Sequence, residues 1–446
     1  MNPAEREANL LDVGRRLVAA SPADETEALL VEGRSLLTRF SRNQVHQNVG
    51  TEDVWVVLRL VVGGRLGIAT TSSLRPEALD QAVACAMTIA RASQPEEGWP
   101  GLPRPEPVKP ASSYDAATAE APADARADVA AEIIEAARRQ RGEAAGAVEI
   151  EESSAAVANS RGVAAASSHT RTQAHTVVTC GDGSGFAEGV SSRLADLKPR
   201  ALGRRAAAKA AASRNPQPLP AGRYDVILEP PAVAEWLEFL SYMAFGGKAF
   251  QEGRSPFSGK LGQRITGRQV TIWDNALDRR TLPQEFDYEG MPKRRLALID
   301  RGVAKAVATN YYRARRLGKR RSTGSALPAS TGYECLPLHL FMKGGTSSAA
   351  ALVKETNRGL LITRFHYTNI LDPMKTVLTG MTRDGTFLVE GGRIVRPVRN
   401  LRYTENILEA FSRIDGMSRR LTLARGPAVV PTVRVREVNF TGTTEF

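Results

Sequence analysis

The chain has 446 residues, 42% of them hydrophobic and 24% charged, which is the composition of a folded protein with two or three domains. No stretch reaches the roughly 18 to 20 uninterrupted apolar residues that a membrane span requires, and the charged N terminus does not resemble a signal peptide. We therefore expect a cytoplasmic protein that has no membrane partner.

A formal charge of +12 raises the hypothesis of nucleic-acid binding. Six basic residues lie within nine positions: Arg313, Arg315, Arg316, Lys319, Arg320 and Arg321. Aromatic residues make up only 6% of the chain, and none of the common nucleic-acid modules is visible. Nucleic acid is therefore an unfavoured partner, and the cluster is expected to be a solvated loop or helix face.

The cysteines are three in number and far apart, at Cys85, Cys180 and Cys335. They can form neither a disulfide framework nor a CxxC metal site, which agrees with a reducing compartment.

Periodicity in the first half of the chain predicts a helix over 4–20, antiparallel strands between 28 and 73, and a helix over 76–93. The run VWVVLRLV is apolar on both faces, so its strand is expected to be central and covered on both sides. Residues 94–110 are rich in proline and are expected to form a surface loop or tether. Further elements are expected as a helix over 124–141, strands between 147 and 183, and a helix over 202–213.

Composition changes from an Ala-rich helix to alternating strands across 215–222. We therefore predict an α+β protein with an N-terminal mixed α/β domain at 1–214, containing an antiparallel sheet, and a β-rich domain at 222–446. A strand at 223–229 precedes a helix over 233–245, and shorter helices are expected at 347–357 and 406–414. Two dipeptides, Asp384-Gly385 and Gly391-Gly392, predict hairpin turns.

The predicted helix over 233–245 is apolar except for Glu235, Glu238 and Ser241, which lie three residues apart. This spacing predicts one narrow polar stripe on an otherwise buried helix.

Two motifs follow that helix, in the runs EGRSPFSGKLG and FDYEGMP. Their shared positions are Glu252, Gly253, Ser255, Phe257, Gly259, Lys260, Leu261 and Gly262, then Phe286, Asp287, Glu289, Gly290 and Pro292. Together with the closing run TGMTRDGTFLVEGGRIVRPV, they resemble the TldD/PmbA (TldD/TldE) metallopeptidase family. In its metal-dependent members the helix carries HExxxH, and a Cys near the C terminus completes a zinc site.

Counting back from Ser255 places Glu238 and Met243 at the positions of the two histidines, and Phe239 at that of the glutamate. A Met thioether is a poor zinc ligand, and Phe239 cannot accept a proton. On a regular α-helix, residues five apart also point about 140° away from each other. No Cys follows Cys335.

The pattern therefore resembles the TldE (PmbA) branch. This resemblance implies a heterodimer with a zinc-bearing TldD subunit, acting in proteolysis or peptide maturation. This chain would bind no metal, carry no catalytic residue of its own and contribute to peptide binding. A homodimer that only binds peptides stays open, as do a stand-alone enzyme using the cleft around Glu238, Tyr242 and Lys248, and a basic nucleic-acid-binding protein.

Three further candidates come from residue types alone. The run Lys343-Gly344-Gly345-Thr346-Ser347 precedes a predicted helix and offers backbone N–H groups to a carboxylate or phosphate, with a plain helix entry as the default. His169 and His175 are the one histidine pair that might share a site. Cys335 and His339 lie four residues apart, but Pro337 argues for an extended segment that separates them by roughly 13 Å, so an inert buried Cys is favoured.

Overall fold

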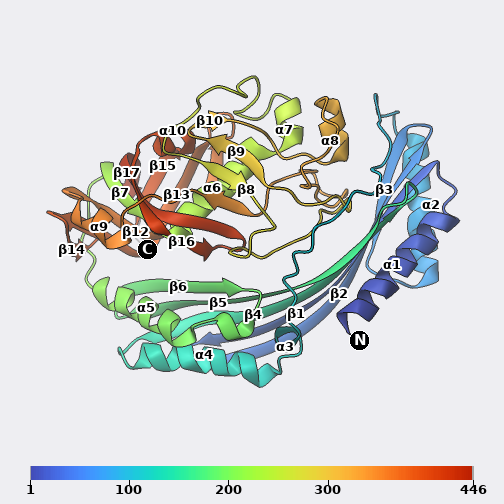
Figure 1. The fold of residues 1–446 in the computed structure, drawn as a ribbon. Coiled ribbons are helices and arrows are strands. Elements are labelled where there is room, and N and C mark those ends of the chain that lie inside the picture. Colours follow the sequence, from blue (N-terminus) through green and yellow to red (C-terminus); the bar gives the residue numbers. More distant parts are fainter. Residues whose placement is uncertain (1, 444–446) are drawn as a thin grey trace.

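The computed structural model describes residues 2–443 and contains two β-sheets, each with its own helices (Figure 1). The first sheet is antiparallel, with strand order β3-β2-β1-β4-β5-β6. Its strands are β1 (Glu25–Ser41), β2 (Gln44–Val62), β3 (Arg65–Thr71), β4 (Glu143–Asn159), β5 (Ala164–Cys180) and β6 (Gly183–Ser191). The α+β fold and the antiparallel sheet predicted from the sequence are confirmed.

Helices cover the outer face of this long curved sheet (Figure 1). They are α1 (Pro3–Ala20), α2 (Pro76–Ala92), α3 (Ala116–Ala119), α4 (Ala123–Arg138) and α5 (Pro199–Ala212), with a short 3₁₀ turn η1 (Leu194–Asp196). The inner face of the sheet packs against the C-terminal half of the chain.

Strand β2 is covered on both faces, as its apolar sequence predicted. Val56 and Leu58 pack in the cluster formed with α1 and α2. Val57 points to the opposite face and packs with Phe286 and Met291 of the C-terminal half. The two halves of the chain therefore share an apolar contact through this sheet.

The second sheet is mixed, with eleven strands among the described residues. They are β7 (Gly222–Leu228), β8 (Ile272–Asp274), β9 (Leu296–Asp300), β10 (Val303–Ala304), β11 (Leu340–Met342), β12 (Arg358–Asp372), β13 (Val377–Glu390), β14 (Arg393–Pro397), β15 (Leu401–Asn406), β16 (Ile414–Ala424) and β17 (Ala428–Thr443). Strand β7 pairs with both β12 and β17, so β7, β12, β13, β15 and β17 form a closed ring.

Helix α6 (Pro230–Leu240) packs against β12 and β17. The remaining helices of this half are α7 (Gly247–Gln251), α8 (Tyr311–Arg316), α9 (Ala349–Lys354) and α10 (Ile407–Ser412). The helices predicted at 347–357 and 406–414 therefore exist but are shorter than expected.

One of the two predicted hairpin turns is wrong. Asp384-Gly385 is not a hairpin turn, because β13 runs through it with a register shift against β12. The positive φ angles of Asp384 (54°) and Gly385 (120°) are used in this bulge. Gly391-Gly392 does connect β13 to β14 in a tight hairpin, as predicted.

The proline-rich segment 94–110 is not a free tether, because part of it is buried between the sheet and the C-terminal half. Leu102 is fully buried, and its backbone N–H donates to Glu25 Oε2 at 3.0 Å. The Trp99 indole donates to the same oxygen at 2.9 Å, and Asn159 donates to the Pro103 carbonyl. These bonds satisfy the backbone of a segment that cannot form regular structure.

Candidate functional site

Helix α6 begins after Glu229, with Pro230 in its first turn, and buries almost all of its surface. Trp236 is fully buried and stacks on Phe365 with ring centroids 5.2 Å apart. The last turn of the predicted helix is not α-helical: residues Ser241–Phe245 form a π-helical turn, in which hydrogen bonds run from i to i+5. The 140° argument, which assumed a regular α-helix, is therefore wrong for this segment.

The rest of this helix is buried, as predicted, but most of its polar stripe is buried as well. Glu235 is 3% exposed and Ser241 is 4% exposed, so two of its three members are buried. Ser241 Oγ donates to the Pro337 carbonyl, and Glu235 accepts from Thr368 Oγ1. Both side chains therefore form hydrogen bonds with buried protein groups instead of with solvent.

The three positions that correspond to the zinc motif have different surroundings. Glu238 is half-buried and accepts a 3.4 Å hydrogen bond from Tyr242 Oη. Phe239 packs on the main core cluster, and Met243 lies within it at 2% exposure. Glu238 therefore contributes the one polar side chain of the three.

Arg425, which no sequence pattern singled out, occupies the space beside Glu235 and Glu238. Its Nη1 lies 3.1 Å from Glu235 Oε2, and its Nη2 lies 3.3 Å from Glu238 Oε2. Its backbone N–H donates to Glu188 Oε1 of β6 at 3.1 Å. Arg425 stands in the β16–β17 turn with a positive φ of 47°, so the turn directs its side chain toward helix α6.

Burial raises the pKa of the Glu235 carboxyl, and the nearby Arg425 guanidinium opposes that shift. Burial likewise raises the pKa of Glu188, against the hydrogen bond and charge of Arg425. One guanidinium thus compensates three carboxylates from two different elements.

This arrangement does not fit a zinc ion. A hydrolytic zinc requires three N, O or S ligands and an open position for water. Here the corresponding residues supply one carboxylate, one buried thioether and one apolar ring, with a fixed positive charge beside them. Across residues 2–443, no three His, Cys, Asp or Glu side chains are placed so that they could hold a metal.

The cleft candidates Tyr242 and Lys248 lie near Glu238 in one surface group. Tyr242 contacts Tyr333, which is 51% exposed, with ring centroids 5.5 Å apart. Lys248 Nζ lies 3.1 Å from Glu334 Oε1. Burial raises the pKa of Glu334, but hydrogen bonds from Arg313 and Lys248 outweigh it and lower that pKa overall.

The candidates Lys343, Gly344, Gly345 and Thr346 lie apart from this group, before helix α9. Two of the backbone N–H groups expected to be free are already used: that of Lys343 donates to the Thr271 carbonyl and that of Gly345 to the Ser418 carbonyl. The prediction of free donors is wrong at these two positions. Thr346 lines a cavity of about 440 Å³ together with Arg419 and Arg420.

That cavity adjoins a second one, of about 380 Å³, because both are lined by Ala349, Arg420, Thr422 and Thr432. The second cavity reaches Glu188 and Ala424, next to Arg425. The run before α9 and the Arg425 group (Arg425, Glu188, Glu235 and Glu238) therefore lie at opposite ends of two adjoining cavities, and only the second cavity is lined by both halves of the chain.

The histidine and cysteine candidates do not form sites. His169 and His175 lie on one strand, about 20 Å apart by their six-residue spacing. His169 is held between Ser113 and Ser167, and burial lowers its pKa to about 4. Cys335 is fully buried, with its thiol on the Ala308 carbonyl, and burial raises its pKa to about 11.

The basic cluster at 313–321 folds onto acidic residues of the same chain. Arg313 makes a two-pronged contact with Glu334, at 2.8 and 2.9 Å. Arg316 donates to the Glu97 carbonyl, and Arg321 pairs with Glu106. Two of the six cationic side chains, Arg313 and Arg321, are therefore paired with carboxylates of the same chain.

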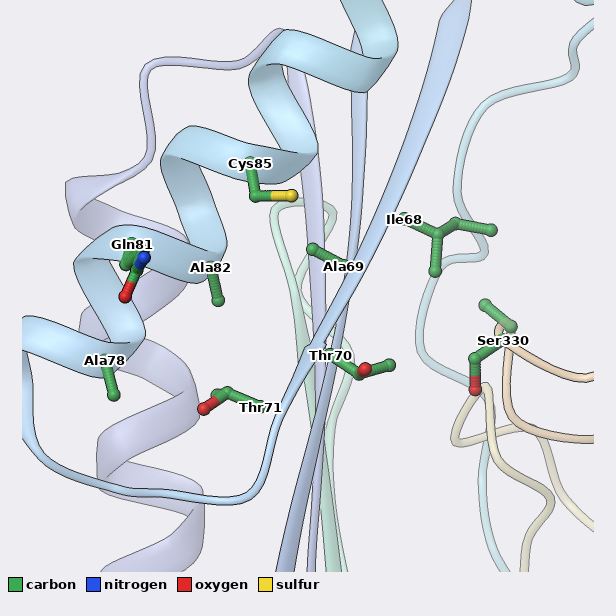
Figure 2. A pocket seen from close by; sticks show the side chains of 10 residues that line it. Ile68, Ala69, Thr70, Thr71, Ala78, Gln81, Ala82, Cys85 and Ser330 are labelled. Carbon is green, nitrogen blue, oxygen red and sulfur yellow. The ribbon is translucent and has the colours of Figure 1, made fainter.

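A separate groove of about 640 Å³ runs beside β3, the edge strand of the first sheet (Figure 2). Its walls are β3 itself, helix α2 with Ala82 and Cys85, and a loop of the C-terminal half that carries Ser330. None of its lining residues belongs to the Arg425 group.

The PmbA/TldA metallopeptidase C-terminal domain model matches residues 221–442, the domain 1 model matches 26–90, and the central domain model matches 117–214. The chain belongs to the PmbA/TldD family.

Solved structures of low sequence identity share the fold across almost the whole chain. TldE from Thermococcus kodakarensis has a TM-score of 0.86 at 22% identity, with 98% of this chain and 99% of that chain covered. A protein of Thermotoga maritima MSB8, described as a candidate modulator of a DNA gyrase, has a TM-score of 0.85 at 20% identity, with 96% and 99% covered.

Curated relatives match more locally. A metalloprotease of Methanothermobacter thermautotrophicus is 26% identical over 286 residues, which is 62% of each chain. A TldD-homologous metalloprotease of Buchnera aphidicola is 25% identical over 203 residues, or 44% of this chain and 41% of that one. The chain thus spans less than two thirds of the length of these curated relatives.

In this member of the family, the motif around Asp287 has a structural role. Asp287 accepts backbone N–H bonds from Glu289, Met291 and Ala326, and burial raises its pKa to about 7. The Glu289 carboxylate accepts from Arg59 of β2. The motif therefore ties the C-terminal half to the first sheet.

The motif around Ser255 supports the π-helical turn instead. Ser255 is fully buried, and its Oγ donates to the Ala244 carbonyl at 2.8 Å. The same Oγ accepts from the Phe257 backbone N–H. A carbonyl of the turn is thereby satisfied by a side chain, as irregular helical segments require.

Proposed function

We propose that this chain is the metal-free, TldE-type subunit of a cytosolic peptidase complex whose zinc lies in a TldD-type partner. The observation that carries the proposal is the guanidinium of Arg425 between Glu235 and Glu238, on the helix where metal-dependent members carry HExxxH. The Arg425 guanidinium supplies the positive charge that balances the two carboxylates. Unlike a zinc ion, it has no open coordination position for a water nucleophile.

The likeness to a TldE structure over 98% of the chain supports the same role. The metalloprotease names of the curated relatives support peptides as the substrate class. In the complex, this chain would stabilise its partner, bind peptide and form part of the wall of a chamber, enclosed by the two subunits, in which the partner cuts peptides. Catalysis would belong to the partner.

The edge of β3 offers an extended peptide a place to bind. Strands β2 and β3 are joined by a hairpin in which Val62 pairs with Arg65 across Gly63 and Gly64. From this closing pair onward, every second residue of β3 directs its backbone hydrogen-bonding groups toward β2, and the residues between them direct theirs to the open edge. Backbone N–H and C=O groups of Ile68 and Thr70 then point away from β2, toward the groove of Figure 2. A peptide strand added there would extend the sheet.

The test is to purify the chain alone and together with an HExxxH-bearing TldD-type chain from the same organism, and to measure zinc content and peptide turnover. We expect no stoichiometric zinc and no turnover from this chain alone, co-elution of the pair, and activity only in the pair. One zinc per isolated chain would refute the proposal. Turnover by the isolated chain that is lost in Glu238→Ala would establish a stand-alone enzyme instead.

A further inference from the structure

A cavity of about 400 Å³ lies between the two halves of the chain, away from the Arg425 group. Asp182 from the β5–β6 turn and Ser213 at the end of α5 line it from the N-terminal half. Arg383 and Thr386 of β13, with Arg399 before β15, line it from the other half. Both halves therefore contribute polar groups to one space.

Two residues that line this cavity each carry a buried hydroxyl group without a partner. Ser213 is 7% exposed and Thr386 is 3% exposed, yet neither Ser213 Oγ nor Thr386 Oγ1 has a hydrogen-bond partner among the described residues. Buried polar groups in folded proteins are almost always paired, so an unpaired hydroxyl requires a reason. Here two of them, one from each half, line the same cavity.

Two guanidinium groups in the same cavity also lack a carboxylate. Arg383 is half-buried and Arg399 is exposed, and neither has an ion pair or a side-chain hydrogen bond within residues 2–443. The contrast with a neighbour is direct, because Arg364 on the adjacent strand is bonded to Asp384 at 2.7 Å. No carboxylate of the described residues is therefore paired with either of these two guanidinium groups.

One acidic side chain, Asp182, also lines the cavity, and its Oδ1 accepts the backbone N–H of Asn215 at 3.0 Å. The charged side chains that line the cavity are therefore Arg383, Arg399 and Asp182, which together carry a net charge of one positive unit. That balance suits a group with one negative charge and disfavours one with two.

We propose that this cavity binds a small oxyanion through Arg383, Arg399, Ser213 and Thr386, and so links the two halves of the chain. The shared chemistry is a planar or tetrahedral group with several acceptor oxygens, for which guanidinium and hydroxyl donors are suited. Its two sources are a carboxylate and a phosphate. The single net charge makes the carboxylate the tighter ligand.

The test uses the full chain and four small probes at equal ionic strength: sodium chloride, inorganic phosphate, N-acetylglycine and N-acetylglycinamide. Thermal unfolding midpoints and isothermal titration measure binding, since a ligand of the native state raises the midpoint. We expect N-acetylglycine to raise the midpoint most, phosphate to raise it less, and the uncharged amide to match chloride. If neither anion exceeds chloride, the hydroxyls bind water only and the proposal fails.

Single variants distinguish binding in this cavity from nonspecific attraction of anions to a basic protein. Arg383→Gln and Arg399→Gln should each weaken binding roughly ten- to a hundredfold, as expected for loss of hydrogen bonds to a charged ligand. Arg393→Gln removes the same charge from the exposed start of β14, outside the cavity, and should leave the affinity unchanged. Equal losses in all three variants would overturn the proposal.

Thr386→Val provides a second and independent arm. Removing an unpaired buried hydroxyl should leave the unliganded midpoint equal or higher, because the cost of burying it disappears. The same variant should lose part of the shift produced by N-acetylglycine. A full shift in Thr386→Val would contradict a role for this hydroxyl in the site.

Discussion

Arg59 Nη2 and Glu289 Oε1 lie 2.9 Å apart, although 230 residues separate them in the chain. The same nitrogen lies 2.8 Å from the carboxylate of Glu27, and all three side chains are almost completely buried. A single guanidinium from β2 therefore compensates one carboxylate of its own sheet and one from the family motif of the other half. The contact between the halves depends on this triad as well as on the apolar contact of Val57.

Replacing Arg59 should be one of the most damaging single changes in the chain. Arg59→Ala leaves Glu27 and Glu289 buried without a counter-charge, and losing one partner of a buried ion pair typically costs about 3–5 kcal/mol. Urea unfolding measures the free energy of unfolding. Arg16→Ala, which removes an exposed i,i+4 pair with Asp12, is the control and should change it by at most about 0.5 kcal/mol. Equal effects of the two substitutions would show that the triad does not stabilise the fold.

The same triad should make stability depend on pH. Burial, opposed by Arg59, raises the pKa of Glu27 to about 7, well above its ordinary value of 4.5. Because the folded state holds this proton more tightly than the unfolded state, the contribution of Glu27 to stability falls as pH rises from about 4.5 to 7. Above pH 7 no further change comes from this group.

Glu27→Gln removes that titration and keeps an oxygen for Arg59. Between pH 5 and 7, the wild type should lose stability relative to Glu27→Gln by up to about 1.4 kcal/mol per pH unit. Urea unfolding of both proteins at half-unit intervals measures the difference. Parallel curves across this window would mean that Glu27 is ionised throughout it.

The sequence predicted features that depend on local pattern or on motif. Alternating apolar residues predicted the first sheet, and the two-sided apolar run predicted its covered strand β2. The motif around Asp287 and Glu289 indicated the family. Its role in joining the two halves could not be predicted, because that role depends on where Arg59 lies in the folded chain. Spacing alone gave no information about that contact.

Where the prediction was wrong, the reason is tertiary. Asp384-Gly385 has the residues of a hairpin turn, but β13 pairs with β12 both before it, at Arg383, and after it, at Thr386, so the dipeptide forms a bulge. The π-helical turn at 241–245 depends on Ser255, whose hydroxyl satisfies the Ala244 carbonyl from eleven residues further along the chain. Arg425 is one of sixty basic residues and lies 187 positions from Glu238, so no local signal distinguished it.

The three cysteines should differ sharply in reactivity. Cys85 is exposed beside β3, whereas Cys180 and Cys335 are buried, and burial raises the pKa of both buried thiols. A disulfide reagent such as 5,5′-dithiobis(2-nitrobenzoate) at pH 8 should therefore titrate one thiol quickly in the native chain and three in urea. Cys85→Ser should abolish the fast phase, and a fast phase that persists would contradict the burial of the other two.

The same thiol reports on the groove beside β3. If an extended peptide binds at this edge, saturating peptide should slow the modification of Cys85 and leave the slow phases unchanged. Free amino acids, which cannot form a strand, are the matched control. Unchanged modification in the presence of a peptide that is shown to bind would place its site elsewhere.

The sharpest test of the metal-free helix restores the motif that its relatives carry. The triple variant Glu238→His, Phe239→Glu and Met243→His supplies two imidazoles and a carboxylate, but Arg425 still places a positive charge beside them. We expect this variant to bind no zinc, because like charges in a partly buried site repel. Adding Arg425→Ala should permit zinc binding, with Glu235 available as a further oxygen ligand. Zinc per chain, measured after dialysis against a defined free zinc concentration, separates these outcomes.

Two controls make that comparison decisive. Arg419→Ala in the triple background removes an equal charge from β16 at a distance from helix α6, where its guanidinium contacts the Thr346 carbonyl. It should leave the chain free of zinc, since it does not vacate the space beside Glu235. Circular dichroism and urea unfolding confirm folding, because Met243 is 2% exposed and a histidine there lowers stability. Equal zinc binding with and without Arg425 would show that its guanidinium does not stand where the cation would bind.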